Sequence, residues 1–306
     1  MLKGRIELSF YEQISANRRT TFALFAVFFF LILALGFAVS FLMADYFFIP
    51  LFGIIAIVYI LVSYYNSDRL VTAISGAKPA SEQGFRQLHN VVEEMAIAAG
   101  LPKPKVYIID DSAINAFATG RDPQHSVICV TTGCLTRLNR EELTGVVAHE
   151  MSHIRNYDIR VMTMAAILVG IAVLLSDFLL RMFLFGGLTG QSRDNGKGGL
   201  IMIAAIAFGV VLAIITPLIA EVIKLAISRK REYLADASAA EITRYPQGLA
   251  SALGKINADT EPLEAANKAT AHLYIANPLK GQKLWMKSLF STHPDINDRI
   301  NRLRAM

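Results

Sequence analysis

Two long apolar runs near the N-terminus restrict the fold of this chain more than any other feature. Residues 22–43 contain no charged side chain, and after Asp45 a second uncharged run occupies residues 46–65. A helix needs about 20 apolar residues to cross the hydrocarbon core of a bilayer. Both runs meet that length, and only a short connection separates them. We therefore predict a transmembrane hairpin over residues 22–65, preceded by a polar segment at residues 1–21.

A cleavable signal peptide is the alternative interpretation of the first run. Ala38 and Ser40 form a small-x-small pattern of the kind found at cleavage sites. The apolar run is longer than the core of a signal peptide and continues beyond this pattern. We therefore favour an uncleaved span.

Composition also indicates a membrane protein. Hydrophobic residues make up 54% of the chain and charged residues only 18%, so part of the surface must face lipid. The net charge of +5 is compatible with nucleic-acid binding, but the basic residues are dispersed and no nucleic-acid-binding motif accompanies them. We expect no nucleic-acid partner. The two cysteines, Cys129 and Cys134, exclude a disulfide framework and are interpreted as small buried side chains.

Two further apolar runs occupy residues 161–180 and 200–220, on either side of a Gly-rich polar loop at residues 186–199. Asp177 and Pro217 interrupt these runs, so buried helices of a soluble core are the alternative. We favour membrane spans, which gives a mainly α-helical integral membrane protein with four transmembrane helices.

The distribution of basic residues predicts the orientation of the spans. Four basic residues precede the first span, none lies between the first two, and Arg69 and Lys78 follow the second. Lys and Arg concentrate on the cytoplasmic side of membrane spans. We therefore place both termini, together with residues 66–160 and 221–306, in the cytoplasm, with the chain in the plasma (inner) membrane.

Residues 66–160 have the pattern of a globular α+β unit. An amphipathic helix is predicted over residues 81–99, ended by Gly100 and Pro102. Short strands are predicted at residues 106–109, 113–119 and 127–130, with a turn at residues 120–123.

A His-Glu-x-x-His motif follows, formed by His149, Glu150 and His153. Asn139 and Glu142 have the spacing of a capping box and predict a helix that carries the motif. On a helix, the spacing of four residues places both imidazoles on one face, within reach of one tetrahedral zinc ion. Glu150 lies beside that face, where it can act as a general base.

Glu232 is the candidate for a third ligand, because a catalytic zinc site uses three protein ligands and keeps one position open. Asp236 lies four residues later, where it can accept a hydrogen bond from the second ring nitrogen of one histidine. A solvated helix face is the alternative for this acidic pair. The upstream motif leads us to favour the ligand set His149, His153 and Glu232, with one Zn²⁺ per chain.

Four segments resemble the HtpX membrane zinc metalloproteases, which are relatives of the CAAX-prenyl endopeptidases. They are His149-Glu-Met-Ser-His153, Arg229-x-x-Glu232-x-x-x-Asp236, Asn115-Ala116-Phe117 and Ser291-Thr-His293-Pro294. The resemblance implies a gluzincin-type fold, a cytoplasmic active site and a role in the quality control of membrane proteins. It also points to Arg229 or His293 as the group that stabilises the transition state. A topology charge and a residue before the last helix are the respective alternatives.

These observations predict a membrane-bound zinc endopeptidase that cleaves misfolded or damaged membrane proteins or unfolded polypeptides. Asn115, Ala116 and Phe117 would form an edge strand that pairs with extended substrate backbone, although a core strand fits the sequence equally well. A zinc-binding membrane scaffold without proteolysis would not need Glu150, and a transporter would need more polar residues within its spans. Self-association, or association with other membrane quality-control proteins, is compatible with the apolar spans.

Overall fold

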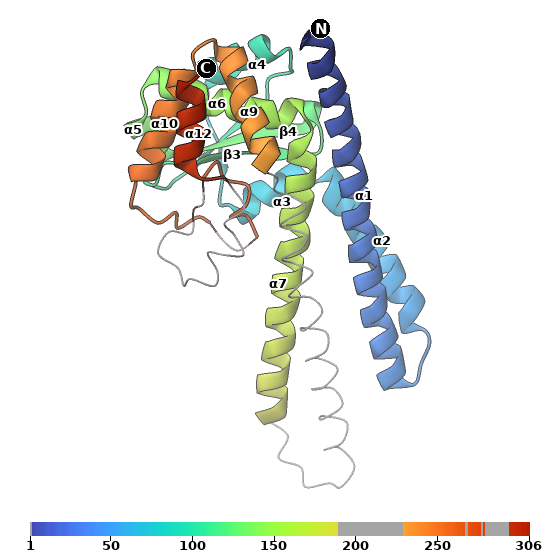
Figure 1. The fold of residues 1–306 in the computed structure, drawn as a ribbon. Coiled ribbons are helices and arrows are strands. Elements are labelled where there is room, and N and C mark those ends of the chain that lie inside the picture. The colour runs from blue at the N-terminus through green and yellow to red at the C-terminus, as the bar shows by residue number, and fades with distance from the viewer. Residues whose placement is uncertain (1, 189–228, 267–268, 277, 279–293) are drawn as a thin grey trace.

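The computed structural model describes residues 2–188, 229–266, 269–276, 278 and 294–306. It combines a bundle of long helices that project in one direction with a globular unit at one end of that bundle (Figure 1). The described elements of the globular unit are mainly helical and enclose a small sheet.

The predicted N-terminal hairpin is present as α1 (Leu2–Met43) and α2 (Phe48–Tyr65). The polar N-terminal segment is the first part of α1 rather than a separate unit, since the helix continues from it without a break. Ala44, with a φ of 53°, begins the tight connection. A Cβ atom on Gly36 would lie 2.7 Å from Cβ of Phe52, so the two helices approach closely because this position carries no side chain.

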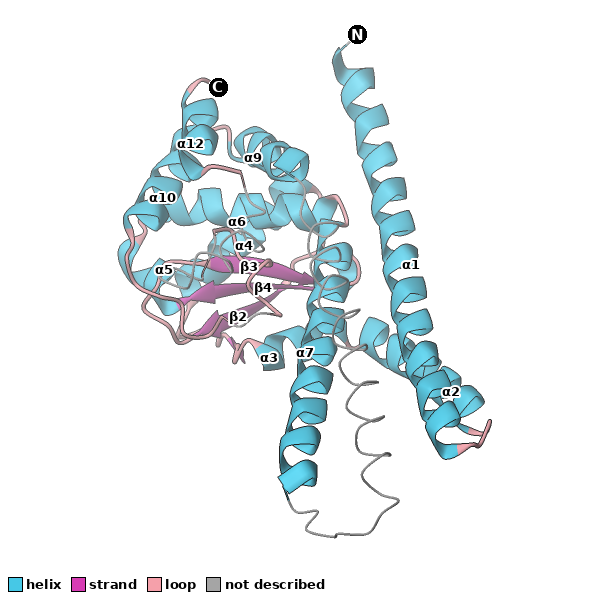
Figure 2. Cartoon of the chain, turned by 60° about the horizontal axis from the view of Figure 1, so that its bottom comes forward, coloured by secondary structure: helices cyan, strands magenta, loops and turns pink. Residues whose placement is uncertain are grey.

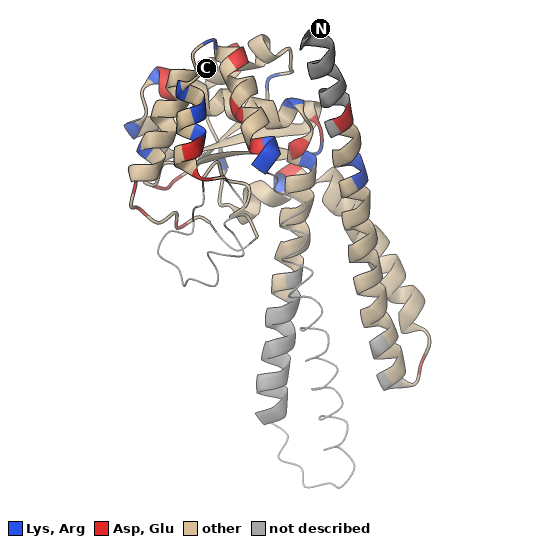
Figure 3. Cartoon of the chain, in the orientation of Figure 1, with Lys and Arg blue, Asp and Glu red and all other residues tan. Residues whose placement is uncertain are grey.

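Within the described residues, two helices are long and apolar enough to cross a membrane, Ile14–Phe41 and Phe48–Tyr65. Their outer parts carry exposed apolar side chains, among them Phe30, Phe37 and Ile54. Charged residues gather on the globular unit and on the adjacent part of α1, while the far end of the hairpin carries Asp45 in its connection (Figure 3).

The third apolar run lies in α7 (Asp158–Leu188), which projects beside the hairpin (Figure 1). The beginning of α7 is buried in the protein, where Val161, Ala165 and Leu168 pack against Leu24 and Phe28 of α1. Residues 200–220 lie outside the described residues. A membrane role for these two runs therefore stays a prediction.

A four-stranded sheet in the order β1-β2-β4-β3 forms the centre of the globular unit. The central pair is parallel and the two outer pairings are antiparallel, with Phe117 opposite Cys129 at the β3 edge. The strands are β1 (Lys78–Pro79), β2 (Lys105–Ile109), β3 (Ala116–Gly120) and β4 (Ser126–Thr131). The strand predicted at residues 113–119 begins three residues later than expected, at Ala116, because Asp259 and Thr131 bind the amides of Ile114 and Asn115.

Helices cover both faces of the sheet, so β3 and β4 are buried along their whole length. Alternate residues such as Ile128 and Val130 pack toward α4 (Arg86–Ala99) and α6 (Arg140–Arg155). Residues of opposite parity, such as Phe117 and Cys129, pack toward α3 (Ser67–Ile74) and the start of α7. The predicted helix over residues 81–99 starts only at Arg86, since residues 82–85 form a turn, and it ends at Gly100 with a φ of 68°.

The helix α6 lies between the sheet and an outer group of helices (Figure 2). The outer group consists of α9 (Arg229–Thr243), α10 (Pro246–Ala258) and α12 (Ile296–Arg304), and the short α5 (Thr132–Arg137) precedes α6. A Cβ atom on Gly145 would lie 2.6 Å from the backbone nitrogen of Leu249, so α6 and α10 approach closely at this glycine. The helix is consequently buried along most of its length.

Candidate metal centre

The helix α6 begins with the predicted capping box. The side chain of Asn139 accepts a hydrogen bond from the amide of Glu142, and the carboxylate of Glu142 accepts one from the amide of Asn139. Glu142 also accepts hydrogen bonds from Ser251 at 2.7 Å and Lys255 at 2.7 Å, both on α10. These contacts fix the start of the helix that carries His149 and His153 two to three turns later.

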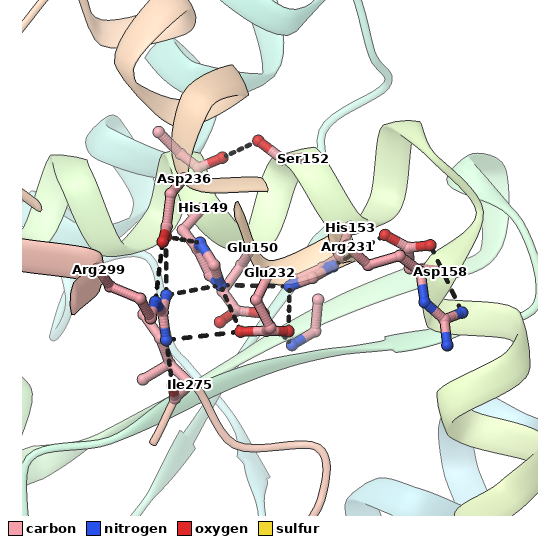
Figure 4. A network of polar contacts seen from close by, with 12 residues as sticks. His149, Glu150, Ser152, His153, Asp158, Arg231, Glu232, Asp236, Ile275 and Arg299 are labelled. Carbon is pink, nitrogen blue, oxygen red and sulfur yellow. Dashed lines mark hydrogen bonds and ion pairs between the residues drawn. The ribbon is translucent and has the colours of Figure 1, made fainter. Parts of the chain in front are cut away.

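The structure brings together the three residues predicted to hold the metal. One potential ligand atom from each of His149, His153 and Glu232 lies within 4.8 Å of the other two. The Nε2 atoms of the two histidines are 3.2 Å apart. The Glu232 carboxylate lies 3.8 Å from Nε2 of His149 and 3.6 Å from Nε2 of His153. Figure 4 shows the three side chains pointing toward one another from α6 and α9.

The donor set fits zinc. Two imidazoles and one carboxylate are ligands that zinc uses in catalytic sites, which keep a fourth position open. Two nitrogens at about 2.0–2.1 Å from a tetrahedral ion lie about 3.3 Å from each other, close to the Nε2 separation in this chain. All three side chains are buried, and their ligand atoms converge on one another as the donors of a metal site do.

Each histidine has a carboxylate at its second ring nitrogen. Nδ1 of His149 lies 3.0 Å from Oδ1 of Asp236, and Nδ1 of His153 lies 3.1 Å from Oδ2 of Asp158. Such contacts fix the ring orientation of a metal-binding histidine and raise its basicity. Asp236 therefore lies where the sequence placed it, whereas the sequence analysis did not include Asp158.

The two carboxylates leave the imidazoles with different proton affinities in the metal-free chain. Burial lowers the pKa of His149, and the charge of Arg299 adds to this effect against the opposing influence of Asp236. Burial also opposes protonation of His153, but the hydrogen bond to Asp158 and the charges of Glu232, Asp158 and Glu150 outweigh it and raise the pKa to about 9.

Glu150 lies beside the ligands with a protonation equilibrium suited to proton transfer. Burial and the charge of Glu232 raise its pKa to about 7, although His153, Arg299 and an amide hydrogen bond act in the opposite direction. Its Oε2 atom accepts that hydrogen bond from the amide of Ala118, at 2.8 Å. The base predicted from the motif is therefore in contact with the edge strand β3.

Arg299 is the main site residue that the sequence analysis missed. Its side chain is 1% exposed and donates to both carboxylate oxygens of Asp236, at 2.8 and 2.7 Å. Nη1 donates to the carbonyl of Ile275 at 3.0 Å and lies 3.5 Å from the Glu232 carboxylate. A signal was present: Arg299 lies on the apolar face of α12 formed by Ile296, Ile300 and Leu303, where an arginine is unusual.

The remaining predicted residues differ in their surroundings. Asn115 is buried and donates to the carbonyl of Ala276 at 3.2 Å, and Phe117 is a core residue whose ring packs on Tyr274 at 5.0 Å. The carbonyl of Ala116 accepts a hydrogen bond from the amide of Ile275. Arg229 is exposed in the first turn of α9. His293 lies outside the described residues.

This arrangement defines a class of site. Two histidines and a glutamate converge in a buried cluster that is able to hold a divalent metal, and a second glutamate with a raised pKa lies next to them. These are the parts of a metal-dependent hydrolase, in which the metal activates water and the carboxylate transfers the proton.

Sequence comparisons with known proteins agree with a metal-dependent hydrolase. The model of peptidase family M48 matches residues 82–306. A protease HtpX homolog from Dictyoglomus thermophilum is 47% identical over 97% of this chain and 95% of that protein. Homologs from Thermoanaerobacter pseudethanolicus and Streptococcus gordonii are 47% and 42% identical over 97% of this chain and 97% and 99% of their own lengths. The crystal structure of S. mikatae Ste24p matches 81% of this chain and 58% of that protein, with 21% identity and a TM-score of 0.45.

The chain belongs to peptidase family M48, within the group of HtpX proteases. It is a membrane metalloprotease, a hydrolase of peptide bonds.

Proposed function

We propose that this metalloprotease is a zinc endopeptidase at the cytoplasmic face of the membrane, and that it cleaves misfolded or damaged membrane proteins and unfolded polypeptides. The observation that carries the proposal is the buried convergence of His149, His153 and Glu232 beside Glu150. One zinc ion per chain would be held by the first three side chains.

Glu150 would perform the proton transfers. Zinc, when bound, supplies a Lewis acid that lowers the pKa of a coordinated water to about 7 and polarises the substrate carbonyl. A carboxylate with a pKa of about 7 is able both to accept a proton and to release it near neutral pH. Glu150 would take the proton from the attacking water and deliver it to the leaving amide nitrogen.

The strand β3 would align the substrate. It lies at the edge of the sheet, and the amide of Ala118 contacts the carboxylate of Glu150 directly. An extended peptide added to this edge would pass beside the base and the metal ligands. The carbonyl of Ala116 and the amides of Ala118 and Gly120 are already hydrogen-bonded within the chain, so pairing at this edge requires these bonds to be exchanged.

A positive group near the scissile carbonyl would stabilise negative charge in the transition state. Arg229 and His293 remain our proposals for this role. Arg229, being exposed, would approach a substrate from the solvent side of α9. Arg299 would instead act on the ligands, since its donors already bind Asp236 and Ile275.

The position of the metal centre supports a preference for substrates in or near the membrane. His153 contacts Asp158 at the start of α7, and Asp158 is hydrogen-bonded to Asn17 of α1, within the apolar helix Ile14–Phe41. The site thus lies beside the inner end of a candidate span. Exposed Arg18 and Arg19 lie at this end, which agrees with a cytoplasmic orientation.

The proposal is tested by the variant Glu150→Gln, with metal analysis alongside a peptide-cleavage assay. Retained zinc with cleavage reduced by at least about 100-fold is expected, since general acid–base catalysis contributes 10²–10⁴-fold. Glu141→Gln, in the exposed first turn of the same helix, is the matched control and should retain full activity. Unchanged cleavage by Glu150→Gln would refute the assigned base, and zinc without cleavage in the wild-type chain would favour a non-proteolytic scaffold.

The ligand set and the substrate preference need separate measurements. Glu232→Ala should lower zinc occupancy, and full stoichiometric zinc in that variant would remove Glu232 from the ligands. For the substrate, cleavage of a membrane-anchored polypeptide and of a soluble unfolded one should be compared with the protease in liposomes. Equal rates would contradict the preference for membrane substrates.

A further inference from the structure

A buried polar contact connects the first membrane helix to the metal centre. Asn17 of α1 is only 5% exposed. Its Nδ2 atom donates to Oδ1 of Asp158 at 2.8 Å and to the carbonyl of Asn156 at 3.0 Å. Asp158 in turn places its other oxygen 3.1 Å from Nδ1 of His153. Two side-chain contacts therefore join a helix at the N-terminus to a metal ligand more than 130 residues away.

The helix α9 also contacts Asn17 and Asp158, through Arg231. Nη1 of Arg231, on α9, donates to Oδ1 of Asn17 at 3.0 Å and lies 3.8 Å from Oδ1 of Asp158. Arg231 directly precedes the ligand Glu232. Asp158 at the start of α7, which contacts His153 of α6, and Arg231 of α9 thus meet α1 through the same amide group (Figure 4 shows the Arg231, Asp158 and His153 side of the junction).

The chemistry of Asn17 suits a positioning role. Its amide donates to an anion through Nδ2 and accepts from a cation through Oδ1, so only one orientation of the group satisfies both neighbours. Asp158 is 1% exposed, and a buried carboxylate is stable only when its oxygens are well paired. Asn17 and Arg231 pair Oδ1, which leaves Oδ2 directed at His153.

Docking of α1 alone does not require this amide. Leu24 and Phe28 already pack α1 against the start of α7 through apolar contacts. A buried amide adds a desolvation cost unless its bonds are made, so an apolar residue would serve simple packing as well or better.

We infer that Asn17 and Arg231 are positioning residues that hold Asp158, and through it His153, in the geometry for metal binding. The zinc affinity of the protease therefore depends on the polar contact that α1 makes through Asn17. This inference rests on the proposed zinc site and adds to it a dependence on the membrane helix.

Zinc affinity of the full-length protein in detergent tests the inference. The expected result is that Asn17→Ala and the near-isosteric Asn17→Leu weaken zinc binding about 10-fold, the lower end of the range for residues that orient metal ligands. The affinity is measured by competition with a chelator. In the Co²⁺-substituted protein, both variants should also shift the visible absorption bands that report ligand geometry.

Leu24→Ala is the matched control, because it loosens the same helix contact without touching the polar chain. It should lower thermal stability and leave both the zinc affinity and the Co²⁺ spectrum unchanged. Asn17→Leu keeps the apolar packing, so its loss of zinc affinity cannot be attributed to failed docking of α1.

A double-mutant cycle tests whether Asn17 affects zinc binding through Asp158. If Asn17 acts through Asp158, combining Asn17→Ala with Asp158→Asn weakens zinc binding no more than Asp158→Asn alone. Additive losses, or wild-type zinc affinity and spectrum in both Asn17 variants, would overturn the inference. A wild-type chain that binds no zinc at all would instead refute the proposed function.

Discussion

The two histidines of the metal centre lie on one helix but are supported from different parts of the molecule. Asp236 and Arg299 support His149, and both come from the C-terminal helices α9 and α12. Asp158 supports His153 from the start of α7, with Asn17 of α1 behind it. The first support lies entirely within the globular unit, while the second extends to α1, which contains a candidate membrane span. One motif can therefore combine a histidine that is held within the globular unit, His149, with a histidine whose position depends on packing against the distant helix α1, His153.

The largest expected effect concerns the support of His149. Arg299→Met removes a buried cation between the carboxylates of Asp236 and Glu232. Breaking a buried ion pair by removing one partner costs about 3–5 kcal/mol, so we expect a loss of unfolding free energy of this size, measured by denaturant unfolding of the metal-free protein.

Arg302→Met is the control for this change, because Arg302 lies on the same helix in an exposed pair with Asp298. Exposed pairs contribute about 0–1 kcal/mol. Equal stability of the Arg299 and Arg302 variants would show that the support of His149 is not a fixed part of the core.

An intermediate effect compares the two carboxylates directly. Asp236→Asn and Asp158→Asn should each weaken zinc binding about 10- to 100-fold. Asp236→Asn should also destabilise the fold, because Arg299 loses the charge of its bidentate partner. Chelator competition and thermal unfolding measure the two properties. If one of the two variants binds zinc as tightly as the wild type does, the corresponding histidine does not need its carboxylate.

The smallest expected effect is at the other end of α6, which supports both histidines equally. Glu142→Gln weakens the capping box and the contact with Lys255, at a cost of about 1 kcal/mol. Burial would raise the pKa of Glu142, but hydrogen bonds from Lys255, Ser251 and Asn139 lower it overall. Its stabilising contribution is therefore present above the ordinary carboxyl pKa and is lost as the pH falls through the lowered value.

The free energy of unfolding, measured as a function of pH, tests the direction of this pH dependence. The difference in stability between the wild type and Glu142→Gln should be constant near neutral pH and disappear in acid. A difference that grew as the pH fell would contradict the lowered pKa. The Co²⁺ spectrum of this variant should match that of the wild type, because Glu142 supports both histidines equally.

Local patterns were enough to predict the elements that carry the site. The capping box, the helix with His149 and His153, and the strands β2 and β4 follow from spacing and alternation within a few residues. The pairing of Glu232 with this helix needed the chemical requirement for a third ligand, since nothing local connects residues so far apart.

The supports of the ligands were harder to predict, because they depend on tertiary packing. Asp158 looks like an ordinary first-turn acid of α7, and Asn17 like a polar residue before a span. Only the docking of α1 against α7 brings them together. Arg299 had a local signal in its apolar helix face, but its partner Asp236 is 63 residues away. The sequence also predicted four membrane spans, whereas the described residues contain two candidate spans.

The pairing at β3 also bears on aggregation. An edge strand with open backbone groups is a template onto which any extended chain can add, including another copy of the same protein. Here Glu150 binds the amide of Ala118, Ile275 binds the carbonyl of Ala116, and Thr163 binds the amide of Gly120. These alternate groups along β3 are already paired within the chain. Strand addition at this edge, by a substrate or by another copy of the chain, therefore has to displace these internal hydrogen bonds.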